Sequence, residues 1–460
     1  MTPAARLSAA IEVLADIEAR HRPAAQALKD WGLSHRFAGS GDRAAIAGLA
    51  YDALRRRASS AFLMGAETPR AVAIGMLRRE RNLGIDEIEK LCDGSRFAPK
   101  PLSDDERARL AAESLEGAPA HVRGDYPAWL DDKLAATFGA ERAEEGAALS
   151  SRAPLDLRVN TLKGTRAEAA AELAEYAPQE TRWSPWGLRI IVAPEAKSPA
   201  IHAEPAFLQG AIEIQDEGSQ VAALLSAAKP GEQVIDLCAG GGGKTLALAA
   251  MMENHGQIFA TDTDKRRLAP IHERLARAGA RNVQVRTPRG PSPSPAEGRS
   301  RLSSTGYGGG VGRGKQRTED SLSDLRGKAD LVLIDAPCTG TGAWRRNPDA
   351  KWRVRPGALA ERLRDQAETL DAAAALVKPG GRIAYITCSV LDDENGAQVR
   401  AFMARQNGFV IVPPADAANA LGERAFLFKR AVLSSGEGLL MTPRRTDTDG
   451  FFVSILRRVA

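Results

Sequence analysis

The spacing of apolar residues divides the chain into a helical first part and a later part in which strands and helices alternate. Up to about residue 115, apolar positions recur every three or four residues, as Leu7, Ile11 and Leu14 do. Ser103 and Glu106 form a capping box, which predicts the start of a further helix. We therefore predict a helical domain over residues 1–125.

A smaller unit is predicted over residues 126–215. Residues 155–161 alternate as in a strand, residues 167–176 have the helical period, and residues 187–192 again favour a strand. A segment of this length suits a compact α+β module and is too short for a catalytic domain. The chemistry is therefore expected in the third unit.

Residues 216–460 contain apolar strands separated by Ala- and Leu-rich helices. Nearly continuous apolar strands in such an alternation are typical of a parallel sheet with helices on both faces. We therefore predict an α/β domain of that kind. Its strands are expected at 233–238, 257–262, 329–335 and 381–387, with later strand signals at 438–442 and 450–456.

Residues 286–328 interrupt this alternation with nine Gly, four Pro and seven Ser and no period. They also hold nine Lys and Arg against four acidic residues, a surplus equal to the net charge of +5 of the whole chain. The bulk charge therefore does not by itself indicate a nucleic-acid-binding protein. We interpret the segment as a basic low-complexity insertion, either an auxiliary RNA tether or a lineage-specific stretch.

Composition excludes several classes of protein. With 43% hydrophobic residues the chain can bury ordinary cores, which excludes wholesale disorder. No stretch approaches the roughly 18 apolar residues of a membrane span, and the N-terminus lacks a secretory signal. The four cysteines form no CxxC pair, which argues against a disulfide framework. We expect a cytoplasmic monomer without a metal ion or a membrane partner.

A glycine-rich loop joins the predicted strand 233–238 to a helix, a junction at which backbone can approach a ligand closely. Cys238 stands where a P-loop needs glycine, and Thr245 stands where a dinucleotide pattern starting at Gly240 needs glycine. The remaining candidate is an adenosyl ligand without a pyrophosphate, such as S-adenosylmethionine. Asp262 supports this ligand because it ends the next strand, where a carboxylate can bind ribose hydroxyls. For the loop alone, a structural turn is the alternative.

Two cysteines and an aspartate lie at the ends of later strands. Asp335 ends the strand 329–335, Cys338 follows it, and Cys388 follows the strand 381–387. Because chemistry in open α/β sheets takes place beyond the carboxyl ends of strands, we expect these three residues beside the adenosyl pocket. Cys92 and Cys238 fit the role of buried small hydrophobic residues.

Such a set of residues suits methylation of a pyrimidine at carbon 5. Carbon 5 is too poor a nucleophile to attack a methylsulfonium until a thiolate adds to carbon 6. An acid at ring nitrogen 3, a role open to Asp335, promotes that addition. A base must then remove the carbon-5 proton so that the thiolate can leave. Two cysteines beside one aspartate meet these needs, without deciding which cysteine attacks.

Taken together, the motifs resemble the Nop/Sun family of RNA cytosine-5 methyltransferases. They read DLCA at 236–239, GGKT at 242–245, DAPCTGTG at 335–342, RRNPDAKW at 345–352, TCS at 387–389 and DGFF at 449–452, with a further match over 209–219. Residues 1–125 are similar, more weakly, to the NusB-like domain of the bacterial Sun/RsmB-type enzymes. The resemblance implies a Rossmann-like methyltransferase domain over 216–460 and an RNA-recognition-like module over 126–215.

The resemblance also implies roles for individual residues. Cys388 of the TC motif is the expected nucleophile, and Cys338 of the Pro-Cys motif assists product release. The expected S-adenosylmethionine-binding residues are Cys238, Ala239, Gly240, Gly241, Gly242, Gly243, Lys244, Asp262 and Asp335. For Lys244 a solvated position is the alternative. Arg158 and Asn160 are expected on a strand of the middle module, facing RNA backbone or forming salt bridges.

Two departures from the family pattern stand out. Ala239-Gly240-Gly241 replaces the usual Ala-Ala-Pro, and we expect cofactor binding to survive this change. The strand at 283–286 lacks the aspartate that the family places near the adenine, for which Asp320 or Asp324 is a candidate substitute.

These features favour an S-adenosylmethionine-dependent RNA cytosine-5 methyltransferase that acts on small-subunit (16S) ribosomal RNA and not on DNA. Transfer RNA is the alternative substrate. The alternative from another class is a non-catalytic RNA-binding assembly factor that retains the fold.

Overall fold

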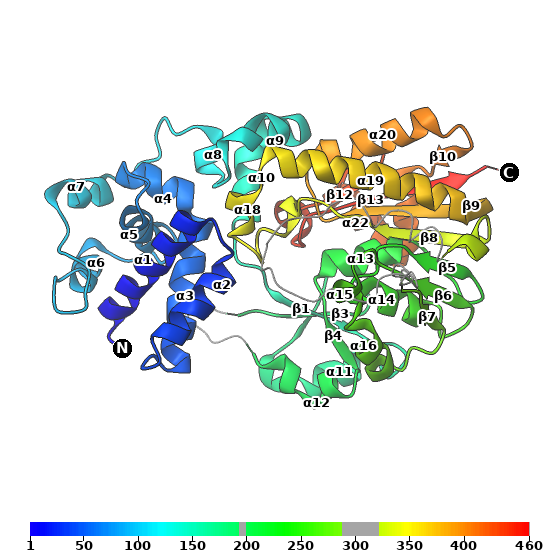
Figure 1. Cartoon of the computed structure of the whole chain (residues 1–460), viewed down its shortest axis with the longest axis horizontal. Helices are drawn as coiled ribbons and strands as arrows, with labels where there is room; N and C mark the ends of the chain where they lie inside the picture. The colour runs from blue at the N-terminus through cyan, green and yellow to red at the C-terminus, as the bar shows by residue number, and fades with distance from the viewer. Residues whose placement is uncertain (193–198, 288–321, 460) are drawn as a thin grey trace, which may run out of the picture.

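The computed structural model describes residues 1–192, 199–287 and 322–459. Figure 1 shows the N-terminal helices on one side of the molecule and a large sheet with its helices on the other. Most of the predicted insertion, residues 288–321, and residues 193–198 and 460 lie outside the described residues. No helix in the described ranges is long and apolar enough to span a membrane.

The first part of the chain is helical, as predicted. Leu7, Leu14, Ile46 and Ile74 lie in its buried core. The predicted capping box is present: the Ser103 hydroxyl accepts from the Glu106 amide, and the Glu106 carboxylate accepts from the Ser103 amide. The helices are α1 (Pro3–Arg20), α2 (Ala24–Ser34), α3 (Ser40–Arg55), α4 (Arg57–Met64), α5 (Pro69–Arg79), α6 (Ile85–Leu91) and α7 (Asp104–Ala112).

Three short helices connect the helical domain to the first strand. They are α8 (Ala120–Arg123), α9 (Asp131–Phe138) and α10 (Arg142–Leu149). Leu134 and Phe138 on α9 and Leu149 on α10 belong to the same buried cluster as residues of the large sheet. Helices α9 and α10 therefore pack on the large domain, whereas the small sheet has a separate core.

The middle module has the order β–α–β–β–α–β. Its elements are β1 (Leu155–Val159), α11 (Arg166–Glu172), β2 (Gln179–Glu180), β3 (Gly187–Ile190), α12 (Pro205–Leu208) and β4 (Ile212–Ile214). The strands lie in the order β2-β3-β1-β4, and every neighbouring pair is antiparallel. This is the ferredoxin-like arrangement, and it confirms the strands expected at 155–161 and 187–192.

The large sheet has a parallel part and an antiparallel edge. Strands β7 (Val283–Val285), β6 (Gln257–Ala260), β5 (Gln233–Asp236), β8 (Ala329–Asp335) and β9 (Val377–Thr387) lie in this order and are parallel. Strands β13 (Phe451–Arg458), β12 (Leu439–Met441) and β11 (Leu433–Ser434) continue the sheet in antiparallel fashion, and β10 (Phe409–Ile411) pairs with β13. The parallel sheet predicted for the central strands is confirmed.

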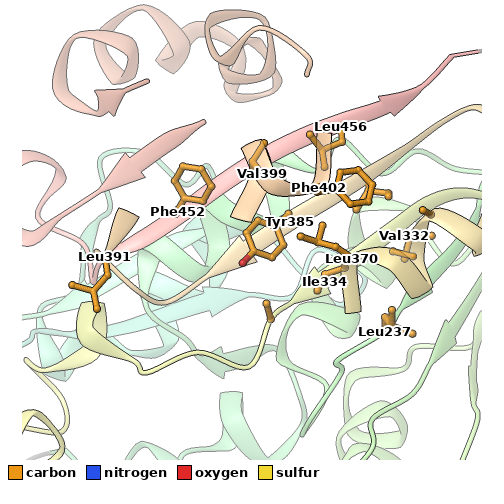
Figure 2. Packing of buried hydrophobic residues seen from close by; sticks show 14 of the residues in the cluster. Leu237, Val332, Ile334, Leu370, Tyr385, Leu391, Val399, Phe402, Phe452 and Leu456 are labelled. Atoms are coloured by element: carbon orange, nitrogen blue, oxygen red, sulfur yellow. The ribbon is translucent and has the colours of Figure 1, made fainter. Parts of the chain in front are cut away.

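Alternate residues of the central strands enter two different cores. On β8, Val332 and Ile334 lie in one cluster, whereas Leu331 and Leu333 lie in the other. The first face packs against α19 (Pro356–Leu376) and α20 (Gly396–Arg405), as Figure 2 shows for Leu370 and its neighbours. The second face packs against α13 (Glu217–Leu225), α14 (Gly243–Met251) and α22 (Ala425–Ala431).

The strand order creates a switch point between β5 and β8. After β5 the chain adds β6 and β7 on one side, then returns to add β8 and β9 on the other. In open α/β sheets, ligands bind beyond the carboxyl ends of the strands at such a point. The glycine loop, Asp262, Cys338 and Cys388 follow β5, β6, β8 and β9, respectively, and therefore meet at this edge.

Candidate active site

The two cysteines expected to react lie in contact. Cys338 follows β8 and Cys388 follows β9, two parallel neighbours whose pairing runs to Asp335 opposite Ile386. The two Sγ atoms are 3.3 Å apart, and both residues are partly exposed. The hydrogen bond to Cys388 and burial raise the pKa of the Cys338 thiol well above its usual value. Cys338 therefore holds its proton in the resting site.

Several hydrogen bonds join the loops that carry the two thiols. The Gly342 amide donates to the Cys388 carbonyl at 2.9 Å. The Val390 amide donates to the Thr341 hydroxyl at 2.9 Å, and the Thr341 and Ser389 hydroxyls are also 2.9 Å apart. The DAPCTGTG and TCS motifs thus form one structural unit.

The glycine loop adopts backbone conformations that favour glycine. Gly240 has a φ of +50° and Gly242 a φ of +84°. A Cβ on Gly242 would lie 2.5 Å from Cγ1 of Ile271 on α16 (Ile271–Ala278), whereas a Cβ on Gly240 would meet nothing closer than 3.5 Å. At Gly240 the neighbours are the ends of two polar side chains, those of Arg267 and Asp262, at van der Waals distance.

Asp262 holds the glycine loop in place. One of its carboxylate oxygens accepts from the Gly240 amide at 3.0 Å, and the other accepts from the Asp264 amide at 2.8 Å. Each oxygen keeps a lone pair for a further donor. The structure thus brings together the residues predicted from the loop to Asp262 at the carboxyl ends of β5 and β6.

Lys244 lies at the site and is not solvated. Its Nζ is 2.7 Å from the Asp335 carboxylate and 5.0 Å from the centre of the Phe451 ring, and the side chain is buried. About a third of the Asp335 side chain stays exposed. The ion pair fixes the Asp335 carboxylate beside the loop that carries Cys338.

Asp236 is a buried carboxyl group below the glycine loop. It accepts from the Thr245 hydroxyl at 2.6 Å through one oxygen, and its other oxygen is buried without a hydrogen-bond partner. Burial, followed by the charges of Asp335 and Asp262, raises the pKa of Asp236 to about 7. Removal from water disfavours the charged form of the carboxyl group.

These residues fit S-adenosylmethionine by their chemistry. Three carboxyl groups, those of Asp236, Asp262 and Asp335, converge at an edge bounded by a glycine loop that approaches ligands with its backbone. Acidic groups suit a positively charged sulfonium and a ribose with two hydroxyl donors. The unpaired oxygen of Asp236 adds a buried acceptor.

Asp324, one of the two candidates for the adenine-side carboxylate, lies against the end of β7. It belongs to the 3-10 helix η5 (Ser323–Leu325), and both of its carboxylate oxygens accept from the Arg286 guanidinium at 3.1 and 3.2 Å. Arg286 directly follows β7, the strand on which the family aspartate is missing. The other candidate, Asp320, lies outside the described residues.

Arg158 and Asn160 do not face outward. Both are buried, with 2% and 4% of their surfaces exposed. Arg158 donates to the Gly243 carbonyl at 3.2 Å, and the Asn160 amide donates to the Gly210 and Ala278 carbonyls. The expectation of contact with RNA backbone is therefore wrong for these two side chains, because they join the middle module to α14 and α16.

The other motifs form buried ion pairs between segments distant in sequence. Asp449 of the DGFF motif accepts from Arg345 at 2.9 Å and from Arg346 at 2.6 Å. Arg346 also donates to Asp216, the N-cap residue of α13, at 2.8 Å. These motif residues therefore join distant segments of the chain to one another and have a structural role.

Two residues at the site were not predicted from the sequence. Glu394 and Asn395 are buried and bond to the segments that carry Cys338 and Cys388. A signal was available, since both follow the TCS motif within seven residues. In a single sequence, however, the polar run DDEN is typical of an exposed loop.

The fold and the site define a Rossmann-like methyltransferase, and comparison with known proteins gives its family. The family described as "16S rRNA methyltransferase RsmB/F" matches residues 223–298 and 311–457. The family described as "Methyltr_RsmF/B-like, ferredoxin-like domain" matches residues 126–195. The chain belongs to the RsmB/F family of S-adenosylmethionine-dependent methyltransferases, which confirms the resemblance and the cofactor expected from the sequence.

Individual relatives agree with this assignment. The probable ribosomal RNA small subunit methyltransferase B of Synechocystis is 31% identical over 72% of this chain and 67% of its own length. The ribosomal RNA small subunit methyltransferase B of Sodalis glossinidius is 32% identical over 72% of this chain and 65% of its own. The chain thus spans about two thirds of the length of these relatives. The crystal structure of PH0851 covers 100% of this chain and 99% of its own, with a TM-score of 0.67 and 25% identity.

Proposed function

We propose that this protein transfers a methyl group from S-adenosylmethionine to carbon 5 of a cytosine in small-subunit ribosomal RNA, through a covalent bond between Cys388 and carbon 6. The observation that carries the proposal is the pair of thiols, 3.3 Å apart at the ends of two neighbouring strands. The Lys244–Asp335 ion pair lies beside them, at the start of the loop that carries Cys338. The names of the relatives support ribosomal RNA as the substrate.

The first step is attack by Cys388. The Cys388 sulfur forms a bond to carbon 6 of the cytosine, its thiol proton passes to the Asp335 carboxylate, and the electron pair of the 5,6 double bond moves to carbon 5. In this proposal Asp335, which pairs with Lys244, then gives that proton to ring nitrogen 3, where it stabilises the adduct. The glycine loop, Asp236 and Asp262 would hold the cofactor, which supplies the methyl group to carbon 5 as a methylsulfonium.

The second step is release, in which Cys338 assists. Carbon 5 must lose its proton so that the double bond can re-form and the Cys388 sulfur can leave carbon 6. In this proposal Cys338 gives its thiol proton to the leaving Cys388 sulfur and, as the resulting thiolate, takes the proton of carbon 5, while ring nitrogen 3 releases its proton to solvent. The contact between the two sulfurs supports this role, because a cytosine bonded to Cys388 would lie close to Cys338.

The proposed function also includes RNA binding by the two smaller parts of the chain. The matched ferredoxin-like module and the helical domain adjoin the large domain, and we propose that both contribute to RNA recognition. Recognition of RNA by shape and splayed-out bases needs such additional surfaces. Transfer RNA is the second candidate substrate.

A methyl-transfer assay tests the function. The purified protein is incubated with labelled S-adenosylmethionine and unmodified small-subunit ribosomal RNA, with transfer RNA in a parallel reaction, and the labelled nucleoside is identified. The proposal predicts 5-methylcytidine in the ribosomal RNA. RNA binding without methyl transfer would contradict it and favour a non-catalytic assembly factor.

A further inference from the structure

We infer that Glu394 and Asn395 are positioning residues that hold the two thiols against each other, with Asn395 fixing the segment of Cys388 and Glu394 fixing the loop of Cys338. Glu394 ends the 3-10 helix η7 (Asp392–Glu394), and Asn395 follows it at the start of α20. They are adjacent in sequence, yet their side chains bond to different cysteine segments. The inference rests on the proposed function only for the separate roles of the two thiols.

Asn395 bonds to the residues on both sides of Cys388. Its side-chain oxygen accepts from the Thr387 hydroxyl at 2.5 Å, and its side-chain nitrogen donates to the Ser389 carbonyl at 2.9 Å. The residue is 3% exposed. The end of β9 is therefore held at Thr387 and at Ser389, which fixes where the Cys388 side chain begins.

Glu394 bonds to the loop of Cys338. Its carboxylate accepts from the Thr339 amide at 2.8 Å and from the Thr339 hydroxyl at 2.5 Å. The Gln366 amide donates both to this carboxylate and to the Pro337 carbonyl, at 3.0 Å each. Residues on both sides of Cys338 are thus held through Glu394.

The η7 helix is itself bonded to the sheet. The hydroxyl of Tyr385, a buried residue of β9, donates to the Glu394 backbone carbonyl at 2.6 Å. A fully buried carboxylate costs free energy unless donors satisfy it, and here three donors do so. If Glu394 and Asn395 only stabilised the fold, their side chains would not need to bond to the residues that flank each cysteine.

Capture of a trivalent arsenical measures the arrangement of the thiols without RNA or cofactor. Phenylarsine oxide condenses with two thiols and releases water, so tight capture requires two sulfurs close together. Wild-type full-length protein is expected to capture it, and Cys338→Ser and Cys388→Ser to lose capture. We expect Glu394→Gln and Asn395→Ala each to weaken capture about tenfold, because the two sulfurs are no longer held at a fixed distance from each other.

A matched control separates positioning from stability. Glu145 on α10 is also fully buried and accepts from Arg445 at 2.8 Å, on α23 (Pro443–Thr446). Glu145→Gln is expected to lower the melting temperature and to keep wild-type arsenical capture. If Glu394→Gln does not fold, Thr339→Val removes only the hydroxyl donor to Glu394 and is expected to weaken capture by a smaller factor.

The kinetic consequences differ between the two positions. Asn395→Ala is expected to lower kcat about 100-fold with little change in KM for the cofactor, because attack by Cys388 slows. Glu394→Gln is expected to lower kcat with accumulation of an RNA–protein adduct, because release slows. The inference would be overturned if Asn395→Ala and Glu394→Gln captured the arsenical as the wild type does and only lost stability, as Glu145→Gln is expected to do. Capture by the wild-type protein without methyl transfer would instead overturn the proposed function alone.

Discussion

At the scale of single residues, the site contains polar groups that are buried. Asp236 shows this most clearly, since it is enclosed below the glycine loop and its only hydrogen-bond donor in the described structure is the Thr245 hydroxyl. Lys244 is buried as well and pairs with Asp335. Burial of such groups costs free energy, and their position at the carboxyl edge of the sheet is where perturbed titratable groups indicate a functional site.

The raised pKa of Asp236 predicts a pH-dependent loss of stability in the protein without cofactor. Its pKa rises from 3.8 in the unfolded chain to about 7 in the native state, so the native state holds the proton more tightly. The contribution of this group to the free energy of unfolding is therefore greatest below about pH 4, decreases up to about pH 7, and is constant above. Asp236→Asn removes this dependence.

Thermal melts between pH 4 and 8 check this prediction. The melting temperature of Asp236→Asn minus that of the wild type is expected to increase on the order of 5 °C from pH 4 to 7 and then level off. Asp104→Asn, at a fully exposed position, is the control and is expected to show no such increase. A constant difference for Asp236→Asn across this range would contradict the account.

At the scale of elements, the apolar pattern predicts strands whose residues enter two cores. Strand β8 was predicted at 329–335 and has these ends, and its alternate residues pack on opposite faces of the sheet. Strand β9 begins four residues earlier than predicted, at Val377. Its Pro379-Gly380-Gly381 segment is accommodated by a register shift between the pairs Ala329–Val377 and Leu331–Arg382.

The site was predictable to the extent that it lies at strand ends. Cys338 and Cys388 follow parallel neighbours, so their contact could be inferred from the order of the strands. Glu394 and Asn395 could not be inferred, because their burial depends on how η7 packs against β9. Arg158 was misplaced for a similar reason: a strand residue can face RNA or a neighbouring domain, and only the docking of the module decides.

The contact between two motif glycines predicts a steric requirement at one position. A Cβ on Gly342 would lie 2.1 Å from the Gly450 carbonyl oxygen, which is backbone and cannot move aside cheaply. Gly342→Ala is therefore expected to cost about 1–3 kcal/mol of folding free energy and to shift the loop that bonds to the Cys388 carbonyl.

Denaturant unfolding measures this cost. Gly357→Ala, in the first turn of α19, is the matched control because its Cβ would meet no atom within 4 Å. It is expected to leave the unfolding midpoint nearly unchanged. Equal midpoints for Gly342→Ala and the control would show that the two motifs do not need this close approach.

At the scale of the whole molecule, a buried lysine joins three parts of the chain. Lys351 Nζ donates to the Arg55 carbonyl at the end of α3 and to the Ser150 hydroxyl just after α10. Trp352 donates to the Leu54 carbonyl, and Arg55 donates to the Arg345 carbonyl. The RRNPDAKW motif thus docks the helical domain on the large domain, the arrangement shown in Figure 1.

Loss of this lysine is expected to loosen the helical domain. Lys351→Met leaves the buried Arg55 carbonyl without this donor, which costs about 1–3 kcal/mol. We expect amide hydrogen exchange at the end of α3 to become roughly tenfold faster. Arg20→Ala, which removes an exposed ion pair with Asp16, is the control and should leave exchange in this region unchanged. Unchanged exchange in Lys351→Met would show that docking rests on other contacts.

The central claim, covalent catalysis with separate roles for two adjacent thiols, is tested most directly by trapping the RNA adduct. Full-length wild type, Cys388→Ser and Cys338→Ser are incubated with labelled small-subunit RNA and S-adenosylmethionine, then resolved under denaturing conditions. The account predicts a denaturant-resistant RNA–protein adduct in Cys338→Ser, and neither adduct nor methylation in Cys388→Ser. An adduct in Cys388→Ser, or methylation by that variant, would contradict it.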